Sequence, residues 1–178
     1  IIWGCLGSIA IACSMGCYQA YIGVTCLIIL VDAIKQLCHG KNIKITFHLL
    51  LKRGIFIVIG GALYYAMVKL HCKIYGVTLA DYKGAGSTSI KNIIFQIPET
   101  VKVAYSTWAD FFWRNTLQIN PFWYRKLSKI MLCIISLSLC IKLISLFKEK
   151  KYFHICFIIG LILMIPIACN LVLLLVPG

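Results

Sequence analysis

An apolar stretch, residues 127–147, decides the fold and reads LSKIMLCIISLSLCIKLISLF. It carries only two charges, Lys129 and Lys142, in 21 residues. About 20 apolar residues in a row are long enough to cross the hydrocarbon core of a bilayer as an α-helix. Both lysines fall near the ends of the stretch, where a long side chain can bring its ammonium group to the membrane surface. The stretch therefore predicts a membrane-spanning helix.

Four further apolar stretches surround it, at about residues 1–15, 18–37, 54–71 and 152–176. The composition agrees, because 61% of the 178 residues are hydrophobic and 13% are charged. A soluble domain of this size has no core large enough to bury that share. The sequence predicts an all-α, polytopic helical membrane protein with about five transmembrane helices. We expect residues 1–178 to form a single membrane domain and to be a fragment of a longer chain.

The chain is strongly basic, with 18 Lys and Arg residues against 5 Asp and Glu, a net charge of +13. In so apolar a chain, this excess indicates contact with anionic membrane lipid and lipid-linked phosphates, and it disfavours nucleic acid. The ten cysteines lie mostly in or beside apolar runs and form no C-x-x-C pair. Cysteines in such positions pack as small apolar side chains. The pattern indicates no metal site and no cofactor, although it leaves a divalent metal open.

Two short loops are rich in basic residues. These are Lys35, Lys41, Lys44, Lys52 and Arg53 within residues 35–53, and Lys148, Lys150 and Lys151 after residue 147. Short basic loops remain on the cytoplasmic side of a membrane. This rule puts the turn at residues 16–19, the long segment 72–126 and the C-terminal end together on the outer side.

Three polar or helix-breaking features lie in the spans. Asp32 precedes Lys35 by three residues near the inner end of its span, which predicts an ion pair on one helix surface. Pro166 predicts a kink in the last span. Asn170, one turn later, is expected to support helix packing through a hydrogen bond.

The outer segment contains an expected amphipathic helix at about residues 88–118. Its apolar residues recur at a spacing of three and four: Ile90, Ile93, Ile94, Ile97, Val101, Ala104, Tyr105, Trp108, Phe111 and Phe112. At about 100° per residue these side chains fall within an arc of about 120°. Such a helix lies in the membrane interface or packs against other protein, and the sequence leaves both open. Pro98 predicts a kink or a restart.

A polar, glycine-bearing turn precedes this helix and reads LADYKGAGS over residues 79–87. The ammonium group of Lys83 can meet a phosphate, and the carboxylate of Asp81 can accept a proton or hold a sugar hydroxyl. The glycines let backbone N–H groups approach such a ligand. A solvated loop with an Asp–Lys pair of little energetic weight remains the alternative interpretation.

Three short motifs carry a family resemblance. They are Tyr18-Gln19-Ala20-Tyr21-Ile22, Leu63-Tyr64-Tyr65, and residues 79–85 followed by the long outer segment. In these motifs the chain resembles the bacterial Gtr type II membrane glucosyltransferases, which are similar to class C glycosyltransferases. The resemblance implies a multi-pass enzyme of the bacterial cytoplasmic membrane. Such an enzyme moves a sugar, glucose by the family name, from a polyprenyl-phosphate donor to O-antigen or another surface polysaccharide on the outer side.

The resemblance also implies substrate-binding residues. Asp81, Tyr82 and Lys83 match the outer-loop motif of the family, and Tyr18 with Gln19 match its tyrosine-glutamine turn. The partners that it implies are membrane lipid, a polyprenyl-phosphate-linked sugar and a polysaccharide acceptor.

The catalytic residues stay unknown, because the acidic loop that supplies them in this architecture is expected upstream of Ile1. The alternative function is a multi-span transporter or flippase component for a lipid-linked or anionic substrate. Such proteins carry ionisable residues and broken helices near the middle of the membrane. The charged residues here lie at the predicted span ends, which favours the transferase.

Overall fold

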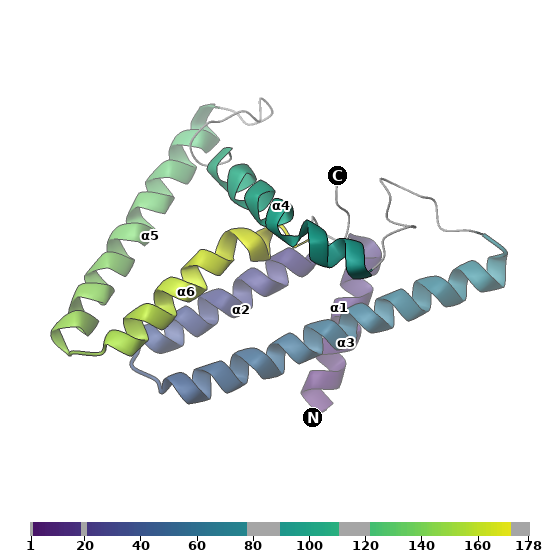
Figure 1. Ribbon diagram of the computed structural model, residues 1–178, viewed down its shortest axis with the longest axis horizontal. Coiled ribbons are helices and arrows are strands. Elements are labelled where there is room, and N and C mark those ends of the chain that lie inside the picture. Colours follow the sequence, from purple (N-terminus) through teal and green to yellow (C-terminus); the bar gives the residue numbers. More distant parts are fainter. Residues whose placement is uncertain (1, 19–20, 78–89, 111–121, 172–178) are drawn as a thin grey trace.

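The computed structural model describes residues 2–18, 21–77, 90–110 and 122–171. Helices make up nearly all of these residues: α1 (Ile2–Cys17), α2 (Tyr21–Cys38), α3 (Ile43–Tyr75), α4 (Ile90–Ala109), α5 (Phe122–Lys148) and α6 (Tyr152–Cys169). The described ranges contain no strand, so the all-α prediction is confirmed. Figure 1 shows α2 and α6 side by side, with α1 crossing α3 and α4 lying over the end of α6.

Within the described ranges, four helices are long and apolar enough to cross a membrane: α2, α3, α5 from Lys126 onwards, and α6. Helix α1 is apolar but has only 16 residues, which correspond to about 24 Å. Many large apolar side chains on these helices are exposed, among them Ile28, Val58 and Ile135. Exposed apolar side chains all round a helix are typical of a lipid-facing surface. The chain is therefore a multi-pass membrane protein.

Helix α3 differs from the prediction, which began this span at residue 54 and assigned Lys44, Lys52 and Arg53 to a loop. The helix begins at Ile43, because the side chain of Asn42 caps it by accepting a hydrogen bond from the Lys44 N–H at 2.9 Å. Lysine and arginine are good helix formers, so their charge does not end a helix. The connection between α2 and α3 is therefore only residues 39–42. The 33 residues of α3 extend over about 50 Å, more than a bilayer core of about 30 Å.

The last span also differs from the prediction. Helix α6 ends at Cys169, not at 176, and continues through Pro166 into its final turn. The backbone N–H of Asn170 bonds to Ile167 O at 3.2 Å and to Pro166 O at 3.3 Å, which closes the helix. Residues 172–176 lie outside the described part of the chain.

The expected amphipathic helix is present as α4, and residues 88–89 and 111–118 of the prediction lie outside the described residues. The helix continues through Pro98 without a restart. Ala104 is only 2% exposed and lies on the side that contacts α6. This part of α4 therefore packs against α6, and a position of the helix in the membrane interface stays a prediction.

The apolar core lies between α2, α5 and α6. Its buried residues are Ala33, Leu37, Leu146, Ile158 and Leu161. Leu37 and Ile158 have no exposed surface at all. The core joins the C-terminal part of α2 to the end of α5 and the first half of α6, so it fixes the turns that follow these helices.

Small residues allow α1 and α3 to cross closely. Gly60 of α3 faces α1, and a Cβ at this position would lie 2.8 Å from Ile11 Cγ2 and 2.9 Å from Ser8 O. The hydroxyl of Ser8 donates to Phe56 O across the contact, at 3.1 Å. Small residues at the contact and a hydroxyl hydrogen bond are a common way to join membrane helices.

A second close contact joins the beginning of α2 to the end of α6. A Cβ at Gly23 would lie 2.7 Å from Cys169 O and 3.1 Å from Ala168 O. The absence of a side chain at Gly23 therefore lets the two backbones meet. Because α2 and α6 run side by side, this contact fixes which end of α6 lies beside the α1–α2 turn.

Candidate functional site

The two basic turns lie side by side. Residues 39–42 and 149–151 form what we call the basic end of the protein. The ring of His154 donates from Nε2 to Lys41 O at 3.2 Å, which joins one turn to the start of α6. The structure thus brings together the two turns that the sequence assigns to one side of the membrane. Which side they face stays a prediction.

At the other end of α2 and α6, away from the basic end, a second group of residues lies together. We call it the tyrosine end and define it by Tyr18, Tyr21, Asn170 and Ala104. Tyr18 follows α1 and is 63% exposed. Its ring meets that of Tyr21 edge to face, with centroids 5.8 Å apart. The 18 residues of α2 separate this end from the basic end by about 27 Å, close to the thickness of a bilayer core.

Helix α4 is attached to the tyrosine end by two polar contacts. The side chain of Asn170 donates from Nδ2 to Ala104 O at 3.4 Å and to Pro166 O at 2.9 Å. The hydroxyl of Tyr105 donates to Leu163 O. The prediction that Asn170 supports helix packing is confirmed. Helix α4, the end of α6 and the Tyr18 turn therefore gather at one end, as the sequence-based assignment to a common side requires.

Four of the five predicted substrate-binding residues lie outside the described part of the chain. They are Gln19, Asp81, Tyr82 and Lys83. Only Tyr18 is placed, at the exposed tyrosine end. The assignment of substrate binding to these five residues stays a prediction.

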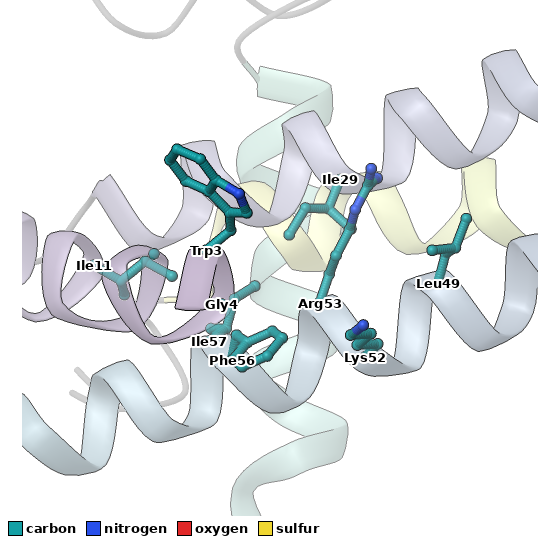
Figure 2. A pocket seen from close by; sticks show the side chains of 10 residues that line it. Trp3, Gly4, Ile11, Ile29, Leu49, Lys52, Arg53, Phe56 and Ile57 are labelled. Carbon is teal, nitrogen blue, oxygen red and sulfur yellow. The ribbon is translucent and has the colours of Figure 1, made fainter. Parts of the chain in front are cut away.

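A groove of about 470 Å³ lies between α1, α2 and α3 and was not predicted from the sequence. Apolar side chains such as Trp3, Ile29 and Phe56 line it, together with Lys52 and with Arg53, whose charge is paired with the carboxylate of Asp32. Figure 2 shows the side chain of Arg53 extending from α3 towards Ile29 of α2. An apolar groove with cations at one side suits a lipid chain beside an anionic group. The cations belong to the half of α3 nearer the basic end, so this groove is separate from the tyrosine end.

Asp32 has a different partner from the one predicted. Its carboxylate pairs with Arg53 of α3 and accepts a second hydrogen bond from Gln36 Nε2 at 2.8 Å. The prediction of a pair with Lys35 was wrong. The Oδ2 atom of Asp32 accepts hydrogen bonds from Gln36 and from the guanidinium of Arg53 on the neighbouring helix. Asp32 is the only acidic residue among the first 80. That isolation in an apolar span was the available signal for an interhelical partner, since a lone charge there is costly.

No group of three His, Cys, Asp or Glu side chains gathers as a metal site within residues 2–18, 21–77, 90–110 and 122–171.

Comparison with known protein families gives a match over the whole of the given sequence. The model of the family described as Glucosyl transferase GtrII matches residues 1–178. The match covers the full sequence and confirms the resemblance drawn from the tyrosine-glutamine and outer-loop motifs. No curated protein and no solved structure matches the chain.

Proposed function

The chain belongs to the GtrII glucosyltransferases, and from this premise we propose that it transfers glucose from a polyprenyl-phosphate donor to O-antigen or another cell-surface polysaccharide. The family match over residues 1–178 is the observation that carries this proposal, and it favours a transferase over a transporter. Four helices able to cross a membrane support a donor that is itself anchored in lipid. The proposed location is the outer face of the bacterial cytoplasmic membrane.

The tyrosine end is the proposed substrate side. The exposed phenol of Tyr18 lies there, and so does α4, which begins at Ile90, after the Asp81-Tyr82-Lys83 triplet and residues 84–89 in the chain. The opposite, basic end carries the lysine-rich turns that the charge rule assigns to the cytoplasm. An outward-facing tyrosine end would meet both the donor headgroup and the polysaccharide acceptor.

Each proposed residue has a binding role rather than a proton-transfer role. Lys83 would pair with the donor phosphate as a point charge, and Asp81 would accept a hydrogen bond from a sugar hydroxyl. Tyr18 and Gln19 would contact the sugar from the turn between α1 and α2. Removing a binding group weakens donor affinity, whereas removing a general base lowers the rate by about 10² to 10⁴.

The test is glucose transfer from polyprenyl-phosphate-glucose by membranes that contain the full-length protein. The variants Asp81→Asn and Lys83→Ala are expected to raise KM for the donor while kcat falls less than about a hundredfold. Lys102→Ala is the matched control, because Lys102 is an exposed lysine of α4 outside the triplet. Full activity in both variants would remove the triplet from the site. A loss of kcat at unchanged KM would contradict the binding role.

A further inference from the structure

The basic end contains a pocket of about 590 Å³ between its two turns. The start of α3 forms one wall and the start of α6 forms the other. Lys44, Lys150 and Lys151 contribute three ammonium groups to its lining, and Tyr152 and Phe153 contribute aromatic rings. The two walls are more than 100 residues apart in sequence, so the pocket exists only because the chain folds the turns together.

The pocket is positive even after its internal ion pair is counted. Lys151 Nζ lies 2.6 Å from Glu149 Oε2. The hydrogen bond from Lys151 holds the pKa of Glu149 below its ordinary value, so Glu149 is ionised at neutral pH. Three lysines and one glutamate leave a net charge of +2. A ligand of this pocket is therefore an anion.

The aromatic residues place this anion at a lipid surface. Phe153 is 84% exposed and Tyr152 is 51% exposed, and the ring of Tyr152 packs edge to face on Phe147 with centroids 5.4 Å apart. The four helices of the described part of the chain that can cross a membrane all end or begin at these turns. Exposed aromatic rings at the ends of spans are typical of the zone where headgroups meet acyl chains. A water-soluble anion would leave Phe153 without an apolar partner.

We propose that this pocket binds the headgroup of an anionic phospholipid from the membrane leaflet at the basic end. The phosphate lies between Lys44 and Lys150, and the glycerol and upper acyl region lie against Phe153. Basic pockets between spans commonly hold anionic headgroups in this way. The bound lipid holds residues 39–42 against residues 149–151, together with the His154 hydrogen bond. The proposal does not depend on sugar transfer, since the tyrosine end lies at the other ends of α2 and α6.

The experiment measures lipid selectivity at the pocket itself. The full chain carrying Phe153→Trp is placed in vesicles of phosphatidylcholine and phosphatidylglycerol, and one of the two lipids is brominated so that it quenches neighbouring indoles. The signal of the chain without this substitution is subtracted to remove the native tryptophans. Because each lysine near a membrane surface contributes a factor of about five, two lysines give a roughly 25-fold preference for phosphatidylglycerol.

Two sets of variants test the lysines. The double variant Lys44→Gln/Lys150→Gln is expected to lose the preference for phosphatidylglycerol, so that the two lipids quench in proportion to their share of the bilayer. The control double variant Lys73→Gln/Lys102→Gln changes two exposed lysines outside the pocket and is expected to retain the preference. Glu149→Gln is expected to increase the preference, because it removes the only negative charge of the two turns. This gain cannot come from misfolding.

Several results would overturn the proposal. They are equal quenching by both brominated lipids, a preference that survives the loss of Lys44 and Lys150, and a preference that Glu149→Gln leaves unchanged. Displacement of the quenching lipid by inorganic phosphate at constant ionic strength would assign the pocket to a soluble anion instead.

Discussion

Gly60 and Gly61 are adjacent in α3 and offer a matched pair for testing the contact between α1 and α3. A Cβ at Gly60 would lie 2.9 Å from the backbone oxygen of Ser8, whereas a Cβ at Gly61 would meet nothing within 4 Å. Both substitutions replace a helical glycine by alanine, so both gain about 0.5 to 1 kcal/mol from backbone entropy. Only Gly60→Ala adds overpacking.

The size of the difference follows from these contacts. Forcing an extra methyl group into a packed contact costs about 1 to 3 kcal/mol. Moving α1 away also weakens the bond from Ser8 to Phe56 O, and such a bond between membrane helices contributes about 0.6 kcal/mol. We therefore expect Gly61→Ala to stabilise the protein by up to about 1 kcal/mol. Gly60→Ala should be less stable than Gly61→Ala by roughly 1.5 to 3.5 kcal/mol.

The assay is reversible unfolding in mixed micelles of a mild detergent and dodecyl sulfate, followed by the circular dichroism of the helices. Ser8→Ala adds a second readout. Its effect should be additive with Gly61→Ala and non-additive with Gly60→Ala, because residues in contact share their energetic effects. Equal stability of the two alanine variants would refute the close crossing of α1 and α3.

Three further predictions use the same unfolding assay. Asp32→Asn should destabilise the protein by about 1 to 3 kcal/mol, since it leaves the guanidinium of Arg53 without its carboxylate in an apolar helix pair; a double-mutant cycle with Arg53→Gln that shows no coupling would contradict this. Gly23→Ala should destabilise by about 1 to 3 kcal/mol through its contact with Cys169 O, whereas Gly160→Ala, with open space around it, should not. Asn170→Ala should cost about 0.6 to 1.7 kcal/mol through the lost hydrogen bond between α4 and α6, and wild-type stability in this variant would argue against that bond.

The length of an apolar stretch predicted the position of a helix well where the helix begins and ends with that stretch. Residues 127–147 lie within α5, and residues 1–15 coincide closely with α1. The start of α3 could not be obtained in this way, because it depends on the cap at Asn42 and not on where the charged residues lie. The end of α6 was missed for a similar reason, since Asn170 closes a helix whose apolar sequence continues.

Contacts between helices were the least predictable part. The sequence offers Lys35 as a local partner for Asp32, and only the packing of α2 on α3 brings Arg53 to the carboxylate of Asp32. The basic pocket likewise depends on two turns that are distant in sequence. Of the predicted substrate-binding residues, Tyr18 is exposed at the tyrosine end, and the role of Asp81, Tyr82 and Lys83 remains a prediction.

The proposed function requires that the tyrosine end faces the outside of the cell and the basic end faces the cytoplasm. Labelling of intact cells with a membrane-impermeant maleimide tests this orientation directly. One variant keeps Cys17, which is exposed beside Tyr18, as its only cysteine. A second variant lacks all native cysteines and carries Lys41→Cys, at an exposed position of the 39–42 turn. The orientation predicts that Cys17 reacts in intact cells and that the cysteine at position 41 reacts only after the membrane is opened. Reaction at position 41 in intact cells, with Cys17 protected, would contradict the orientation and the proposed site of sugar transfer.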